Sequence, residues 1–231
     1  DWLERLEPVD FPGPCGMQRA WTGGSGKLVL FQHGWEADSA DLSTLARAAM
    51  EAGLQVALID GPAHGASDGA RAHMIRFAEG LAAAHERFGA PYAVVAHSMG
   101  FPAAVIAMDR FGLAPERVVA LGAPDSLPAN VRFQASNLGL SSRAAELLLD
   151  AVSYRVGEDA RRLSVTHGAP RMRTPALFCH GAGDRIAPPE ASKRMAQAWP
   201  AAELAIYEGL GHRGVLREPR VVSRVTGFLG G

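Results

Sequence analysis

Short apolar runs alternate with helix-like segments along most of this sequence, and this alternation restricts the fold more than any other feature. The apolar runs are expected strands, and the segments between them carry apolar residues at helical spacing. The expected strands are 15–21, 27–32, 55–59, 92–96, 117–121, 176–179 and 203–207, and the clearest helical segments are 72–88, 99–111, 189–198 and 215–229. Strands and helices in this order form a mostly parallel sheet with helices on both faces. We therefore predict an α/β fold in a single domain over residues 1–231.

One segment, at about 125–173, interrupts the alternation. It contains a helix-like stretch at 141–152, where Leu147, Leu148 and Val152 fall on one face. A connection of ~50 residues without structure would be unusual in a compact domain. We therefore predict that this segment is a small helical cap inserted between two strands of the sheet.

Composition and charge exclude several classes of partner. The chain is 48% hydrophobic and 20% charged, with a formal net charge of −1, so it carries no basic surface for nucleic acid. No apolar run approaches the roughly 20 residues of a membrane-spanning helix. Its two cysteines, Cys15 and Cys179, are too few for a disulfide framework. We expect a cytoplasmic protein, although a chain that starts at Asp1 leaves open a removed leader, and the oligomeric state is not predicted.

The strongest local motif is Ala96-His97-Ser98-Met99-Gly100, between an expected strand and an expected helix. A sharp turn at this place lifts a serine hydroxyl above the edge of the sheet, and it needs small neighbours because the backbone is crowded. The helix that follows also presents free N–H groups near the serine. Ser98 is therefore the candidate nucleophile, and the alternative is an ordinary strand-to-helix turn that happens to contain serine.

Serine needs a base to take its proton, and Asp184 and His212 complete such a set. Each follows an expected strand, so both should reach the edge where Ser98 lies. They stand 86 and 114 residues after Ser98, in the order serine, acid, histidine. The alternatives are that Asp184 caps the next helix and that His212 is a solvated loop residue. The agreement of three motifs favours a catalytic triad.

Acyl transfer places negative charge on an oxygen, and backbone N–H groups can receive that charge. The N–H of Trp35, after the strand at 27–32, and the N–H of Met99 are the candidate donors of an oxyanion hole. We also expect the side chains of Trp35 and His97 to contact substrate. The segment 60–68 opens with Asp60-Gly61-Pro62, a tight turn, and we assign it a stabilising role.

Four further histidines raise the question of a metal site. His33, His64, His97 and His180 each belong to a separate expected loop or strand end, and no His-x-x-x-His spacing links them. We therefore predict neither a metal nor a cofactor.

Taken together, the motifs resemble those of the α/β-hydrolase superfamily, particularly small bacterial members of the esterase and lipase kind. The matching residues run from about residue 27 to the end of the chain: His33-Gly34-Trp35, Asp60 with Pro62, His64, Gly65 and Ser67, His97-Ser98-Met99-Gly100, His180-Gly181 with Gly183-Asp184, and Gly211-His212. The resemblance implies the α/β-hydrolase fold, a triad of Ser98, His212 and Asp184, an oxyanion hole at Trp35 and Met99, and a cap. Two positions depart from the pattern, because Ala96 replaces a glycine and Phe101-Pro102 stands where another glycine is common.

The predicted function is hydrolysis of small or medium acyl esters through an acyl-enzyme intermediate, with a small-molecule substrate. Apolar residues of the cap favour an ester over a charged peptide. Because one fold supports several reactions, a thioesterase, a carbon–carbon hydrolase, a cofactor-free perhydrolase and a non-enzymatic ligand-binding module stay open.

Overall fold

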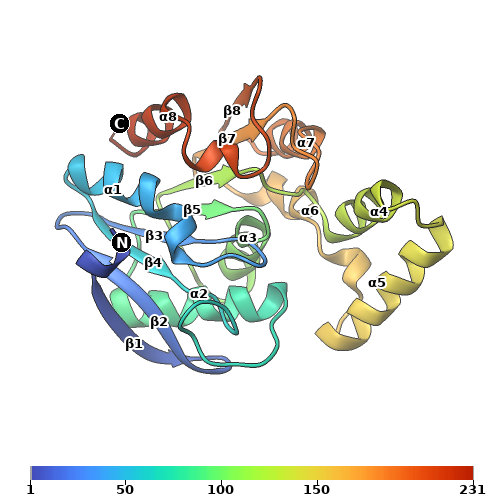
Figure 1. Cartoon of the computed structure of the whole chain (residues 1–231), viewed down its shortest axis with the longest axis horizontal. Helices are drawn as coiled ribbons and strands as arrows, with labels where there is room; N and C mark the ends of the chain where they lie inside the picture. Colours follow the sequence, from blue (N-terminus) through green and yellow to red (C-terminus); the bar gives the residue numbers. More distant parts are fainter. Residues whose placement is uncertain (1, 231) are drawn as a thin grey trace.

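The structure is a computed structural model that describes residues 2–230 (Figure 1). Within these residues one sheet holds eight strands in the spatial order β1-β2-β4-β3-β5-β6-β7-β8. The strands are β1 (Glu7–Gly13), β2 (Gly16–Gly23), β3 (Leu28–Gln32), β4 (Gln55–Ile59), β5 (Ala93–His97), β6 (Arg117–Leu121), β7 (Ala176–Gly181) and β8 (Ala202–Tyr207). Strands β3 to β8 run parallel, while β1 and β2 pair antiparallel. The predicted α/β fold is confirmed.

Helices cover both faces of the sheet, as Figure 1 shows. One face carries α1 (Ser43–Glu51) and α8 (Pro219–Gly230), and the other carries α2 (Met74–Phe88), α3 (Gly100–Arg110) and α7 (Glu190–Ala198). Short 3₁₀ helices occupy Leu3–Arg5, Ser39–Leu42, Ala160–Arg162, Ala169–Arg171 and Gly214–Leu216. Successive residues of a strand point to opposite faces, so Leu30 joins one apolar cluster and Phe31 the other.

Strand β1 is absent from the sequence prediction, which begins the sheet at residue 15. It contains Pro8 and Pro12, which cannot donate hydrogen bonds to a neighbouring strand and argue against a strand when the sequence is considered alone. The structure places β1 at the edge of the sheet, paired only with β2 within the described chain. Proline is tolerated at an edge because half of the N–H groups there face solvent.

The predicted helix at 215–229 is two elements, the 3₁₀ turn Gly214–Leu216 and helix α8. Helix α8 begins at Pro219, whose ring suits the first helical position, where no N–H is needed. Proline inside a continuous helix would remove a hydrogen bond. The break therefore falls where the proline requires it.

The direction of the strand order reverses between β3 and β5. From β3 the chain moves to β4 on one side, whereas the later strand β5 lies on the other side of β3. Neighbouring strands whose connections run in opposite directions leave a gap between their following loops, and ligands of open α/β sheets bind there. The loops after β3, β5, β7 and β8 all meet at this edge.

Helices α4 (Leu127–Asn137), α5 (Ser142–Val156) and α6 (Val165–Gly168) fill the interval between β6 and β7. Figure 1 shows α4 and α5 projecting to one side of the sheet. At the base of this segment the outgoing and returning chains bond to each other: Val165 N–H donates to Asp125 O at 2.8 Å and Leu127 N–H to Leu163 O at 2.9 Å. The helix expected at 141–152 lies in α5, inside the helical insertion.

Candidate active site

Ser98 occupies the turn between β5 and α3, at the carboxyl edge of the sheet. Its φ of 51° lies in the left-handed region, which residues with a Cβ seldom adopt. Two hydrogen bonds maintain this turn, from Ser98 N–H to Leu121 O at 2.9 Å and from Phe101 N–H to Ser98 O at 3.1 Å. A strained turn of this kind exposes a serine hydroxyl between the strand and the helix.

Two glycines allow the loop after β3 to approach the Ser98 turn. A Cβ on Gly34 would lie 2.8 Å from the Cβ of Ser98, and a Cβ on Gly100 would lie 2.6 Å from the carbonyl oxygen of His33. Contacts this short do not occur between real Cβ atoms and their neighbours, so both positions require glycine. Ala96, the departure from the expected glycine, is fully buried in β5.

Phe101, the other departure, has a packing role beneath the turn. Its ring is 1% exposed and meets Phe178 edge to face, with ring centroids 5.5 Å apart. The ring of Trp199 lies 6.1 Å away on the same side of the sheet. An aromatic cluster therefore supports the first turn of α3 directly after Ser98.

His212 lies between Ser98 and Asp184. Its Nδ1 is 2.7 Å from Asp184 Oδ2, and its Nε2 is 3.0 Å from Ser98 Oγ. An ionised carboxylate can only accept, so Nδ1–H donates to Asp184 and leaves Nε2 free to accept the serine proton. The structure thus brings together three residues that the chain separates by as many as 114 positions.

The backbone of Gly122, at the end of β6, packs directly against this histidine–aspartate pair. Gly122 has a φ of 56°, and a Cβ there would lie 3.3 Å from both Asp184 Oδ2 and His212 Nδ1. Sequence reasoning missed this residue, because the short approach exists only in three dimensions. Its signal in the sequence is a single glycine after an apolar strand.

The carboxylate of Asp184 is fully buried and fully hydrogen-bonded. Its Oδ1 accepts the N–H groups of Ile186 at 2.8 Å and Ala187 at 3.0 Å. Burial acts to raise the pKa of Asp184, but hydrogen bonds from His180 and His212 outweigh it and hold the pKa below its usual range. Asp184 is therefore ionised at neutral pH. Asp125, a buried carboxylate that follows β6, instead accepts from Arg194 at 2.6 Å.

The N–H groups of Trp35 and Met99 flank the Ser98 turn and are available to a ligand. Across residues 2–230, neither of them donates to a protein acceptor. Trp35 follows Gly34, which packs against Ser98, and Met99 follows Ser98 itself. Two N–H groups without a protein acceptor next to a serine turn are candidate donors to an oxyanion.

His33 fixes the direction of the Trp35 N–H. The N–H of Gly61 donates to His33 Nε2 at 2.8 Å, so the proton of the neutral ring is on Nδ1, which donates to Gly34 O at 2.6 Å. The peptide between Gly34 and Trp35 is trans, so its N–H points opposite to the bonded carbonyl. Burial lowers the pKa of His33 and keeps the ring in the neutral form that this pattern needs.

The segment 60–68 supports the same loop, in agreement with its predicted stabilising role. His64 Nδ1–H donates to Pro62 O at 2.9 Å, and its Nε2 accepts the N–H of Glu36 at 3.4 Å. On the other side, Arg213 donates to Glu36 O at 3.2 Å. Asp60 accepts the N–H of Ser39 at 2.9 Å. The loop after β3 is thus joined both to the segment after β4 and to the residue next to His212.

A comparison of the sequence with protein-family models agrees with these features of the sheet and the serine turn. The model of the alpha/beta hydrolase family matches residues 28–225. The chain belongs to this family. No curated protein sequence matches it.

Solved structures share the α/β-hydrolase fold along nearly the whole chain. An esterase from Thermogutta terrifontis is 19% identical with a TM-score of 0.71, over 96% of this chain and 98% of that one. An esterase from Exiguobacterium antarcticum is 15% identical with a TM-score of 0.75, over 97% and 100%. A bromoperoxidase from Bacillus anthracis is 19% identical with a TM-score of 0.74, over 96% and 99%. Their different names illustrate that this fold does not by itself define the reaction.

The structure does not place His97 where the sequence predicts it, in contact with substrate. Its ring is 3% exposed, and Nε2–H donates to the backbone oxygen of His212 at 3.2 Å. Burial lowers the pKa of His97 to about 3, so the ring is neutral. The inward position follows from the strand, because His97 is the last residue of β5 and its side chain points to the face opposite its neighbours. His97 therefore supports the loop that carries His212.

The side chain of Trp35, in contrast, is 47% exposed beside the Ser98 turn. Its ring meets that of His64 edge to face, with ring centroids 5.1 Å apart.

Residues 2–230 contain no cluster of three or more possible His, Cys, Asp or Glu metal ligands. In the same part of the chain, no helix has both the length and the apolar character needed to cross a bilayer.

Proposed function

We propose that the protein is a serine hydrolase that cleaves small or medium acyl esters. One observation carries the proposal: His212 bonds to Ser98 Oγ through Nε2 and to Asp184 through Nδ1, at 3.0 and 2.7 Å. This is the arrangement in which a serine becomes a nucleophile. The free N–H groups of Trp35 and Met99 support the same conclusion.

The reaction proceeds by acyl transfer. Ser98 Oγ attacks the ester carbonyl while His212 Nε2 takes its proton, and the N–H groups of Trp35 and Met99 stabilise the oxyanion. The tetrahedral intermediate collapses to the acyl-enzyme, and His212 gives its proton to the leaving alcohol. Water then attacks the acyl-enzyme, with His212 as base, and releases the carboxylic acid and free Ser98. Asp184 stays ionised and orients the imidazole.

An uncharged acyl group fits the side chains near the triad. Trp35 and Ile186 are 47% and 48% exposed, and they belong to the loops that carry the oxyanion donor and Asp184. Helix α4 adjoins the latter loop, where Asn137 donates to Arg185 O at 3.2 Å and Gln134 to Ile186 O. The cap presents the exposed apolar residues Leu138, Leu140, Leu147 and Leu148. Exposed apolar side chains on these elements suit an acyl chain better than a charged peptide.

The proposal is tested by hydrolysis of p-nitrophenyl esters from acetate to palmitate, with wild type beside Ser98→Ala. We expect turnover in the wild type, highest for short or medium chains, and its loss in the variant with an unchanged circular dichroism spectrum. Equal turnover in both pure proteins would disprove the role of Ser98. If neither protein hydrolyses these esters, parallel assays test the other reactions of the same triad. An acyl-CoA tests for a thioesterase, a diketone for a carbon–carbon hydrolase, and peroxide with a carboxylic acid for a perhydrolase.

A further inference from the structure

His180 is a buried histidine next to the triad that the acyl-transfer mechanism does not use. It lies at the carboxyl end of β7 and is 0% exposed. Its Nε2 is 3.2 Å from Asp184 Oδ2, on the carboxylate oxygen that also accepts from His212. The same Nε2 lies 3.0 Å from the carbonyl oxygen of Ala187. This histidine therefore contacts the acid of the triad from inside the protein.

The partners of His180 define which nitrogen carries the proton. Nε2 faces a carbonyl and a carboxylate, both of which only accept, so Nε2 is protonated and shares its N–H between them. Nδ1 lies 2.7 Å from Oγ of Ser192, a fully buried residue of α7. In the neutral ring Nδ1 has a lone pair, so the Ser192 hydroxyl donates to it. If the proton were on Nδ1, the lone pair of Nε2 would face both acceptors, and if the ring were flipped, a C–H group would face them instead.

The loop from Asp184 to Ala187 closes this network. Ala187 N–H donates to Asp184 Oδ1 at 3.0 Å, while its carbonyl accepts from His180. His180 thus restrains the carboxylate twice, directly at Oδ2 and through the peptide of Ala187 at Oδ1. Since Asp184 orients His212, any rotation of this carboxylate changes the direction of the imidazole toward Ser98.

We propose that His180, held in its Nε2–H form by Ser192, is a positioning residue that sets the orientation of Asp184 toward His212. The inference rests on the proposed function, because it gives His180 a part in the same triad. His180 touches no substrate atom and acts only through Asp184. Ser192 extends the network to α7, so this helix also contributes to the alignment of the triad.

A purely structural histidine would matter for its shape, whereas a positioning histidine matters for its donor. Glutamine at position 180 can bring an N–H to the place of Nε2, and methionine has a similar length but no donor. The pair His180→Gln and His180→Met therefore separates hydrogen bonding from packing. Ser192→Ala provides a milder third variant, which keeps the ring but removes the group that fixes its proton.

The kinetic test compares kcat and KM for a p-nitrophenyl ester in wild type and these three variants, with thermal unfolding of each. We expect His180→Met to lower kcat by roughly 10- to 100-fold, with KM within about 2-fold of wild type, because a small misplacement of catalytic groups slows the chemical step. His180→Gln should retain kcat within about 5-fold, and Ser192→Ala should fall between the two. Equal kcat in His180→Gln and His180→Met would overturn the proposal. If His180→Met does not fold, a wild-type kcat in Ser192→Ala overturns it instead.

A second readout needs no turnover. The Nδ1–H of His212, bonded to Asp184, gives a far-downfield proton signal in NMR spectra, which is assigned by its loss in His212→Ala. At one fixed pH, we expect this signal unchanged in His180→Gln and shifted upfield or broadened in His180→Met; the same signal in both contradicts positioning. If the wild type hydrolyses no ester but this contrast holds, the ester proposal fails while the positioning of Asp184 stands. If the wild type hydrolyses esters through Ser98 but the NMR signal is the same in His180→Gln and His180→Met, the ester proposal stands and the positioning of Asp184 by His180 fails.

Discussion

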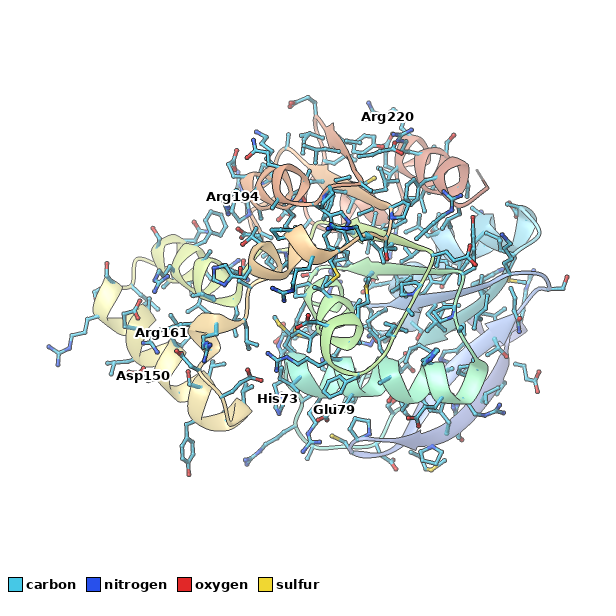
Figure 2. All side chains as sticks on the ribbon, turned by 180° about the vertical axis from the view of Figure 1, so that it is seen from behind. His73, Glu79, Asp150, Arg161, Arg194 and Arg220 are labelled. Carbon is cyan, nitrogen blue, oxygen red and sulfur yellow. The ribbon has the colours of Figure 1, made fainter. Side chains whose placement is uncertain are left out.

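The carboxyl edge of the sheet and the helical cap lie next to each other but are held in different ways. At the sheet edge, His33 and Asp184 are at most 5% exposed, and each satisfies several backbone groups. In the cap, Arg161 pairs with Glu146 at 2.9 Å and with Asp150 at 2.8 Å, and all three side chains are at least one third exposed. Figure 2 labels Arg161 and Asp150. Polar contacts are buried at the edge and solvated in the cap.

This difference in burial determines how strongly polar contacts restrict the arrangement of each region. A buried polar group that loses its partner costs about 1–3 kcal/mol, so the edge has one favourable arrangement. Exposed ion pairs contribute little, so the position of the cap is weakly determined by them. The buried Asp125, at the base of the cap, pairs with the half-exposed Arg194 of α7 at 2.6 Å; Figure 2 labels Arg194. The arrangement of the sheet edge is therefore more strongly determined by its polar contacts than that of the cap.

The largest effect should come from removing the base at the sheet edge. His212→Ala should lower kcat by roughly 10⁴- to 10⁶-fold, because Ser98 loses its proton acceptor. Asp184→Asn should lower it by roughly 10⁴-fold through a misoriented imidazole. Both are measured as ester hydrolysis by folded protein. Wild-type activity in Asp184→Asn would remove Asp184 from the triad, and Asp125→Asn is the control, expected to stay active because Arg194 binds that carboxylate.

Two adjacent leucines of α5 test whether the cap has a core of its own. Leu149 is 0% exposed and Leu148 is 52% exposed. Leu149→Ala should lower the free energy of unfolding, or of local cap opening, by about 2–5 kcal/mol, because it leaves a cavity. Leu148→Ala should change it by less than about 0.5 kcal/mol. Urea unfolding and hydrogen exchange measure both, and equal effects would show that the cap packs differently from this account.

Alanine substitutions at Gly122 and Gly112 distinguish the effect of crowding next to Asp184 and His212 from the effect of backbone strain alone. Both have a positive φ, 56° and 74°, but a Cβ on Gly112 meets nothing within 4 Å, whereas one on Gly122 meets Asp184 and His212. Gly122→Ala should lower kcat by roughly 10- to 100-fold. Gly112→Ala should destabilise the protein by about 1 kcal/mol and leave kcat unchanged. A Gly122→Ala enzyme with wild-type kcat would show that the pair tolerates displacement.

Acid should weaken the sheet edge, because His33 and His97 are buried there as neutral rings. The pKa of His97 is about 3 in the folded protein against about 6.5 in the unfolded chain, so only the unfolded chain takes up a proton between these values. Stability should therefore fall as the pH drops below about 6.5, by up to about 1.4 kcal/mol per pH unit for this group. Urea unfolding at several pH values measures the slope, which His97→Gln should reduce. A stability that rises toward acid would contradict this.

The sequence was sufficient to predict that Ser98, Asp184 and His212 lie close together, because each of them comes shortly after an apolar run. Parallel strands end at one edge, so the spacing along the chain is enough to bring Ser98, Asp184 and His212 together. Side-chain direction within a turn is different. His97 precedes Ser98 in the motif and is predicted near the substrate, yet it points inward, because β5 extends as far as His97 and the strand alternation determines its direction.

Other features depend on contacts that the sequence does not display. Gly122 matters because the turn after β6 passes close to a histidine 90 residues later, and β1 exists because β2 offers it a partner despite two prolines. The restraint of Asp184 by His180 likewise depends on which atoms face each other behind the sheet edge. Such features arise from packing, after the order of the strands is established.

The central claim, that Ser98 is an activated nucleophile, is tested most directly by covalent labelling. Diisopropyl fluorophosphate transfers its phosphoryl group to an activated serine with loss of fluoride, and mass spectrometry of the digested protein locates the adduct. We predict a single adduct on Ser98 in the wild type, a much slower reaction in Asp184→Asn, and none in Ser98→Ala. Labelling at another residue, or no labelling of the folded wild type, would contradict the account.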